Sequence, residues 1–215
     1  MTHPEFMHSM RSLHVLLNEL GLLQQVYTTQ ALRPSGEFVS YALSDNPQYA
    51  VLYRLGLRNR DYNFLLNDYS YLQFGHAGGN DDLSLRFGFY ANPFGPVPNL
   101  ADLFDGADYE MYLQLLEDQD EVSSAMAVRY DVALRDYIEL RHPAAHLHIG
   151  LDENSRWPVD KILSPLAFTL WMLKLFYPDQ WADSHDDRLS RAKSECQHLG
   201  GELFSPRERD QLYFT

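Results

Sequence analysis

The sequence contains a series of short strand-forming segments joined by short turns. The segments are rich in β-branched and aromatic residues, and several alternate apolar with polar side chains. Strands that follow one another through short connections pair antiparallel. The pattern predicts sheet regions over about 38–90 and 122–151, with strands at 38–43, 49–55, 62–66, 69–74, 83–89, 124–134 and 145–151.

Helical patterns lie near both ends of the chain. Apolar residues recur at three- and four-residue steps in the first twenty residues, with Pro4 in the first turn and Gly21 at the end. Ser164 and Pro165 form an N-cap and N1 pair that begins a strongly apolar helix. The predicted helices cover residues 4–20, 100–104, 109–116, 164–177 and 186–199.

These elements predict one α+β domain over residues 1–215. It contains a mostly antiparallel sheet of five to seven strands, with the N- and C-terminal helices packed on one face. The chain has 215 residues, of which 45% are hydrophobic. That apolar fraction excludes a disordered chain and supplies an ordinary core.

Charge and composition exclude several classes of function. Seventeen Lys and Arg residues against thirty Asp and Glu residues give a net charge of −13, which argues against broad DNA binding. A single cysteine excludes a disulfide framework. The longest apolar run, 165–177, contains a lysine and is too short to span a bilayer, and no signal peptide begins the chain. We therefore expect a cytoplasmic protein without membrane contact.

Two histidines at alternate positions, His146 and His148, form the clearest candidate for chemistry. Because side chains alternate along a strand, these two share one face, and Leu147 and Ile149 share the other and pack on the core.

Arg129 and Asp131 have the same two-residue spacing in a second predicted strand, where Val128, Tyr130 and Val132 would face the core. If the two strands are neighbours, one sheet face presents all four polar side chains, with opposite residues about 5 Å apart.

This set suits cleavage of a phosphodiester without a metal. One imidazole removes a proton, the other returns one, and a guanidinium stabilises the developing charge. The predicted catalytic residues are His146, His148, Arg129 and Asp131, with Asp131 orienting a histidine. The predicted substrate-binding residues are Arg156, His142 and Arg141.

Two other interpretations stay open. Paired histidines on a strand can chelate a transition metal, with Asp131 as the third ligand, or His142 in its place. The same side chains can also form an ordinary hydrogen-bonded network that fixes the strands. We expect the site to act without a metal and without another cofactor. If a metal is present, its ligands are His146, His148 and Asp131.

The order of these motifs resembles that of an uncharacterised bacterial family, a domain of unknown function. The matching segments are Val-Arg-Tyr-Asp at 128–131, His-Pro-Ala-Ala-His-Leu-His-Ile-Gly at 142–150, Arg-Trp-Pro at 156–158, Ser-Pro at 164–165 and Phe-Tyr at 176–177. The Arg-Tyr-Asp and His-Pro order is also similar to a small toxin family of bacterial toxin–antitoxin systems. The resemblance implies that these residues act as a unit, and it associates the chain with bacterial phage-defence loci.

Two functions follow as hypotheses. The first is a phosphodiesterase or ribonuclease-like enzyme that binds RNA or a nucleotide at a local site. The second is a non-catalytic subunit that binds a partner protein in a larger bacterial complex. Exposure discriminates between them, because a catalytic pair must line a pocket, whereas a structural pair is buried and bonded internally.

Overall fold

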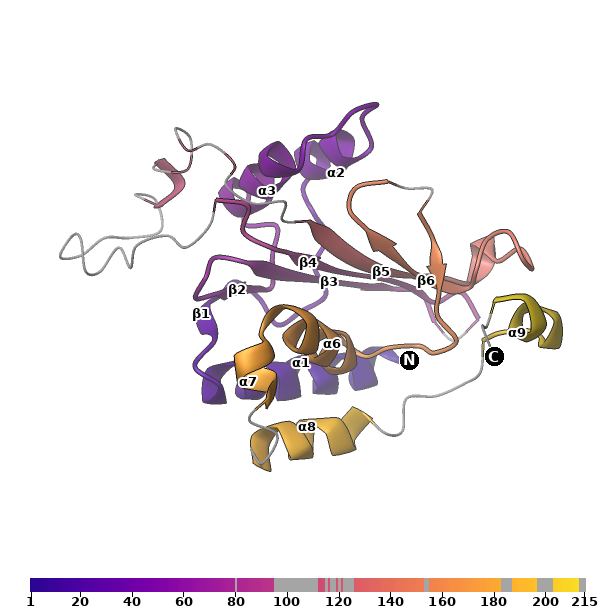
Figure 1. Ribbon diagram of the computed structural model, residues 1–215. Helices are drawn as coiled ribbons and strands as arrows, with labels where there is room; N and C mark the ends of the chain where they lie inside the picture. Colours follow the sequence, from indigo (N-terminus) through magenta and orange to yellow (C-terminus); the bar gives the residue numbers. More distant parts are fainter. Residues whose placement is uncertain are drawn as a thin grey trace.

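A computed structural model describes residues 1–79, 81–94, 112–114, 116, 119, 121, 126–152, 155–182, 187–196 and 203–212. Its centre is a seven-stranded antiparallel sheet in which the strands lie side by side in chain order (Figure 1). The predicted α+β fold with an antiparallel sheet is confirmed. The strands are β1 (Leu23–Val26), β2 (Phe64–Leu66), β3 (Tyr71–Ala77), β4 (Ser84–Tyr90), β5 (Ala127–Ala133), β6 (Ala145–Ile149) and β7 (Trp157–Pro158).

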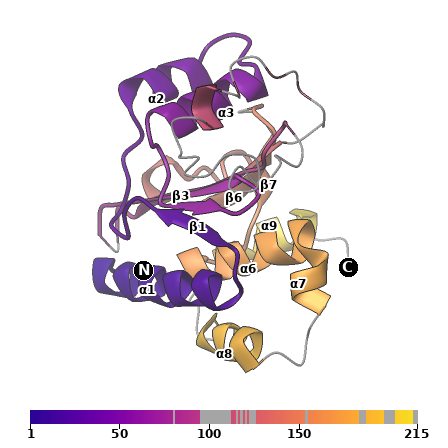
Figure 2. The same ribbon diagram turned by 90° about the vertical axis from the view of Figure 1, so that its left-hand side faces the viewer.

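Helices cover both faces of the sheet. One face packs on α1 and α6, with α8 beyond them, and α2 and α3 lie over the opposite face (Figures 1 and 2). The N- and C-terminal helices therefore share one face, as the sequence predicts. The helical elements are α1 (His3–Glu19), α2 (Gly36–Ala42), α3 (Tyr49–Arg58), the 3₁₀ turn η1 (Leu134–Asp136), α6 (Pro165–Phe176), α7 (Pro178–Ala182), α8 (Asp187–Cys196) and α9 (Pro206–Leu212).

The helices α1 and α6 begin at the capping residues that the sequence contains. Thr2 and Glu5 form a capping box at the start of α1. The Ser164 side chain accepts a hydrogen bond from the backbone of Ala167, which satisfies one of the free amides of α6. The two helices are joined where the backbone N–H of Leu166 donates to the hydroxyl of Ser9 at 2.9 Å.

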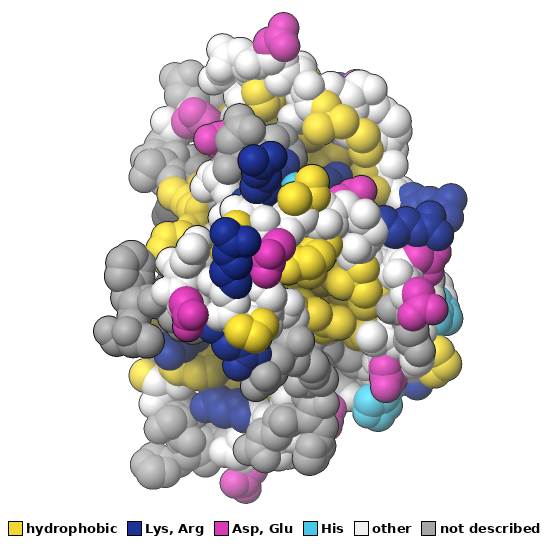
Figure 3. All heavy atoms as spheres, turned by 90° about the vertical axis from the view of Figure 1, so that its right-hand side faces the viewer, with side chains coloured by type: hydrophobic (Ala, Val, Ile, Leu, Met, Phe, Trp, Pro, Cys, Tyr) yellow, Lys and Arg dark blue, Asp and Glu magenta, His cyan; other side chains and the backbone are white. Residues whose placement is uncertain are grey.

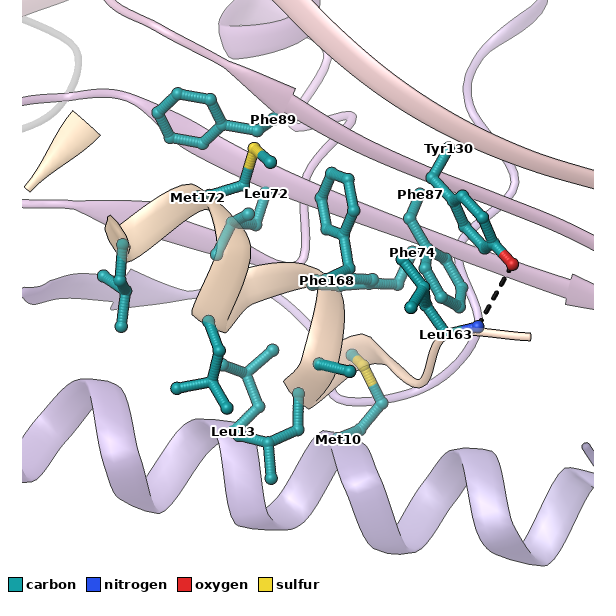
Figure 4. Close-up of a cluster of buried hydrophobic side chains, with 14 of the residues drawn as sticks. Met10, Leu13, Leu72, Phe74, Phe87, Phe89, Tyr130, Leu163, Phe168 and Met172 are labelled. Carbon is teal, nitrogen blue, oxygen red and sulfur yellow. Dashed lines mark hydrogen bonds between the residues drawn. The ribbon is translucent and has the colours of Figure 1, made fainter. Parts of the chain in front are cut away.

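The core between these helices and the sheet combines many leucines with a cluster of aromatic rings (Figure 4). Phe168 of α6 lies 6.2 Å from Phe74 and 6.0 Å from Phe87, measured between ring centroids. The Tyr130 hydroxyl accepts a hydrogen bond from the Leu163 amide at 3.1 Å and donates one to the Lys161 carbonyl at 2.6 Å. These bonds attach β5 to the segment before α6, so its alternate residues, Arg129 and Asp131, point to the other face of the sheet.

The predicted strands at 38–43 and 49–55 are wrong, because both segments lie in helices. Ser35 caps α2 by accepting a hydrogen bond from the Phe38 amide at 3.2 Å, and Asp61 holds the Ser35 hydroxyl at 2.7 Å. The buried residues of α3 recur at helical steps, as Leu52 and Leu55 do. Capping and tertiary packing outweigh the strand propensity of the aromatic and β-branched residues here.

Other predicted elements are close to those observed. The strands predicted at 62–66, 69–74, 83–89, 124–134 and 145–151 correspond to β2 to β6, whereas β1 and β7 were not predicted. The helices predicted at 4–20, 164–177 and 186–199 correspond to α1, α6 and α8. The helix predicted at 100–104 lies outside the described residues. Of the helix predicted at 109–116, the described residues 112–114 and 116 are helical.

Candidate functional site

The strands β5 and β6 are antiparallel neighbours, and their register brings the predicted polar residues together. Arg129 lies opposite His148, and Asp131 lies opposite His146. All four side chains are on the sheet face turned away from α1 and α6, because the alternate residues of β5 belong to the core on the other side.

The core-facing residues follow the predicted alternation with one exception. Val128, Tyr130 and Val132 are buried in the core, and Leu147 packs partly against it. Ile149 is 53% exposed, so the prediction that it packs on the core is wrong. It is the last residue of β6, beyond the two positions that pair with β7, and the strand end leaves it uncovered.

A cavity of about 270 Å³ lies at this site. Residues of β4, β5 and β6 line it, together with Arg156 from the segment before β7. Among the residues predicted from the sequence, it brings together Asp131, His146, His148, His142 and Arg156. Its remaining polar lining residues are Ser84, Arg86 and Asp136.

Two predicted residues do not line this cavity. Arg129 is only 5% exposed and lies beside Asp131, with its Nη2 atom 3.8 Å from Oδ2 of the carboxylate. Its position suits charge compensation within the protein rather than contact with a substrate. Arg141 is exposed in the turn that closes the Ile138–His142 bridge, so its side chain is not part of the cavity lining.

Arg86 is the residue in contact with Asp131 that the sequence prediction missed. It lies opposite Asp131 in the pairing of β4 and β5, and its Nε atom is 3.2 Å from Oδ1 of Asp131. The alternation of the segment 83–89 puts Arg86 on the polar face of a strand. It does not indicate which strand lies beside β4. Asp131 therefore stands between Arg86 and Arg129, with one carboxylate oxygen turned toward each.

Both histidines are held through the same ring nitrogen. Nδ1 of His146 lies 3.2 Å from the Pro143 carbonyl oxygen, and Nδ1 of His148 lies 3.3 Å from the Asp152 carbonyl oxygen. A carbonyl oxygen can only accept a hydrogen bond, so each Nδ1 carries a proton. In the neutral tautomer, Nε2 then has the lone pair.

The histidine pair lines the cavity but is also buried and bonded internally through Nδ1, so its exposure fits both hypotheses. The two rings meet edge to face with centroids 4.8 Å apart, and His146 is 3% exposed. Burial, together with the neighbouring His148, lowers the pKa of His146 to about 4. His146 is therefore neutral at physiological pH, with the lone pair on Nε2.

Asp131, His146 and His148 form a possible metal-binding group. Each offers one ligand atom, and these atoms lie within 4.8 Å of one another. Nε2 of His148 is 3.5 Å from Oδ2 of Asp131. Two imidazoles and one carboxylate are a donor set that divalent transition metals prefer. His142 is not part of this group, although its ring centroid lies 5.2 Å from that of His146.

The charge on the protein surface is mixed rather than uniformly basic. Figure 3 shows one side of the molecule, on which Lys and Arg side chains form separate groups with acidic and apolar side chains between them. This distribution agrees with the net charge of −13.

Fold and site together define an α+β protein whose antiparallel sheet carries a histidine–aspartate cluster and two arginines around one cavity. The chain belongs to a family described as an uncharacterised conserved protein, DUF2290, and the sequence model of that family matches residues 24–215. Membership of an uncharacterised family, expected from the motifs at 128–177, is confirmed. No curated protein and no solved structure matches the chain.

Among the described residues, no helix combines the length and the apolar character needed to cross a bilayer.

Proposed function

We propose that this chain is an enzyme that cleaves a phosphate ester, with a phosphodiester of a nucleotide or of RNA as the substrate class. One observation carries the proposal: the cavity that contains Asp131, His146 and His148 is also lined by Arg86 and Arg156. Phosphoryl chemistry needs cations that hold the phosphate oxygens and a group that activates the attacking oxygen. This cavity contains residues of both kinds.

Arg156 is the residue best suited to hold the phosphate. Its Nε atom is buried and has no hydrogen-bond partner among the described residues, although a buried donor normally has one. A phosphate oxygen in the cavity would supply the missing acceptor. Arginine also matches the oxygens of a phosphate in a planar, two-pronged geometry.

Arg86 supports the same role from the opposite wall. Its side chain is 47% exposed and lines the cavity, and its Nε atom is 3.2 Å from Oδ1 of Asp131. A phosphate bound between Arg86 and Arg156 would lie next to the histidine pair.

The histidines and Asp131 provide the activating group. The Nε2 lone pair of His146 can accept a proton from water or from a substrate hydroxyl, as in the metal-independent mechanism expected from the sequence. Alternatively, the three side chains can hold an ion that activates a water molecule. Either form of activation serves the same reaction.

The size of the cavity limits what enters it. Sites for whole drug-sized ligands enclose roughly 300–1,000 Å³. A cavity of about 270 Å³ accepts one phosphate with an attached sugar, and the rest of the substrate would extend outside.

A panel of phosphate esters tests the proposal. The purified protein is assayed with bis(p-nitrophenyl) phosphate, cyclic mononucleotides and short RNA, each with Mg²⁺, Mn²⁺ or Zn²⁺ and with a chelator. We expect turnover of at least one substrate, with kcat/KM at least tenfold lower in Arg156→Ala. The control is Arg207→Ala, an exposed arginine of α9, which should match the wild type. No turnover in any condition, or equal activity in Arg156→Ala, would overturn the proposal.

A specific observation also favours the second hypothesis, binding of a partner protein. Trp157 is 65% exposed on β7, an edge strand of the sheet, and exposed edges pair readily with other chains. Co-expression with the products of the neighbouring genes tests this function. A genuine partner should co-purify with the wild type and with Arg156→Ala but not with Trp157→Arg. Retention by Trp157→Arg would count against it.

A further inference from the structure

We propose that Asp131, His146 and His148 bind one divalent transition-metal ion, of which Zn²⁺ is the representative. The ion would be held by Nε2 of each histidine and by one oxygen of Asp131. The inference deepens the proposed function, on which the role of the ion in catalysis rests. Binding of the metal is a separate property, measurable without any substrate.

The spacing of the three side chains fits such an ion. Zinc lies about 2.0–2.2 Å from nitrogen and oxygen ligands, so in a tetrahedral site the ligand atoms are about 3.4 Å apart. Nε2 of His148 and Oδ2 of Asp131 are 3.5 Å apart, close to that value. One ligand atom from each of the three side chains lies within 4.8 Å of the other two, so the ligands would draw closer together around an ion.

The orientation of both histidines gives independent support. In metal sites, the ring nitrogen that does not bind the metal usually donates to a backbone carbonyl or a carboxylate, which fixes the tautomer and the direction of the ring. Here Nδ1 of His146 donates to the Pro143 carbonyl, and Nδ1 of His148 donates to the Asp152 carbonyl. Both rings are thus prepared in the same way to present Nε2.

Asp131 is oriented in a similar way by an arginine. Arg86 contacts Oδ1, whereas His148 lies next to Oδ2. Arg86, which is not one of the three ligands, thus fixes one carboxylate oxygen, and the other oxygen faces the His148 ligand. We refer to Asp131, His146 and His148 as the trio.

The charges around the trio set a limit on affinity. Arg86 and Arg129 both approach Asp131, and their positive charges would repel a divalent ion. We therefore expect weaker binding than in a structural site with four protein ligands, but with a preference for metals that accept imidazole nitrogen. Mg²⁺, which prefers oxygen ligands, should compete poorly.

Three protein ligands would leave coordination positions free. Because the trio lines the cavity of about 270 Å³, those positions would face the space beside Arg86 and Arg156. This arrangement is typical of catalytic zinc sites, in which a metal-bound water is activated.

Metal binding is tested directly on the full chain. Protein stripped with a chelator is titrated with Zn²⁺ by calorimetry and with Co²⁺ by visible absorption. We expect one equivalent bound, and affinity at least about a hundredfold lower in His146→Ala, His148→Ala and Asp131→Asn. The matched control is His8→Ala, an exposed histidine of α1, which should bind like the wild type.

A second measurement uses only the wild type, in case a variant fails to fold. X-ray absorption at the zinc edge should show two imidazole nitrogens with oxygen ligands and no sulfur. Binding of no metal by the wild type, equal binding by folded trio variants, or a spectrum with fewer than two imidazoles would overturn the inference.

The outcomes also separate this inference from the proposed function. One equivalent of Zn²⁺ without turnover of any phosphate ester would support the metal site and count against the enzyme. Full turnover by chelator-treated protein that binds no metal would support the enzyme and overturn the metal site.

Discussion

Oδ2 of Asp131 lies 3.5 Å from Nε2 of His148, although His146 is the residue directly opposite Asp131 in the sheet. The carboxylate thus reaches diagonally across the pair of strands. Diagonal neighbours on a sheet are within reach of long polar side chains. As a result, one aspartate can act together with both histidines, and the three donor atoms form a compact group.

The first prediction concerns the stability contributed by Asp131. Both Asp131 and the neighbouring Arg129 are buried. Asp131→Ala removes a carboxylate next to this buried guanidinium, and breaking such a buried pair typically costs about 3–5 kcal/mol. We expect the free energy of unfolding, measured by urea denaturation, to fall by about that amount. Asp136→Ala, an exposed carboxylate on the same cavity, is the control and should change it by less than about 0.5 kcal/mol.

The second prediction concerns pH and uses metal-free protein. The pKa of His146 is about 4 in the folded chain, against an ordinary value of 6.5. Between these values, the unfolded chain binds a proton that the folded chain does not, so stability falls as the pH drops from about 6.5 to 4. The loss should approach about 3 kcal/mol at pH 4.

Urea denaturation at several pH values measures this effect. His146→Asn, which keeps a donor for the Pro143 carbonyl but does not titrate, should reduce the dependence on pH in this range. The same slope in His146→Asn and the wild type would show that another group is responsible.

The third prediction concerns the attachment of β5 to the segment before α6. Tyr130→Phe leaves the Leu163 amide and the Lys161 carbonyl without their side-chain partner. Unsatisfied buried groups cost about 1–3 kcal/mol, and we expect destabilisation in that range by thermal or urea unfolding. Tyr27→Phe, at a tyrosine that is 51% exposed, is the control and should cost less. An equal loss in both variants would contradict this explanation.

The fourth prediction concerns the packing of α3 on the sheet. A Cβ atom at Gly56 would lie 2.1 Å from Oη of Tyr71, whose ring is stacked on Tyr90 with centroids 4.7 Å apart. Gly56→Ala therefore forces apart two packed elements and should cost about 1–3 kcal/mol. Gly36→Ala is the control, because nothing lies within 4 Å of a Cβ atom there. If Gly56→Ala unfolds at the same urea concentration as the wild type, α3 does not pack as described.

Part of the site could be predicted from the sequence because it depends on a local rule. Alternation along a strand requires His146 and His148 to share a face, and it requires the same of Arg129 and Asp131. The capping residues Ser164 and Thr2 similarly mark where α6 and α1 begin, since a cap acts on backbone amides a few residues away.

The tertiary structure decided everything that depends on which segments become neighbours. Arg86 joins the site only because β4 pairs with β5, and Arg141 stays outside because its turn carries it away from the cavity. The segments around α2 and α3 became helices although their residues favour strands. Periodicity and capping act over a few residues, whereas strand pairing and burial are set by contacts between segments far apart in the chain, and these contacts override local propensity.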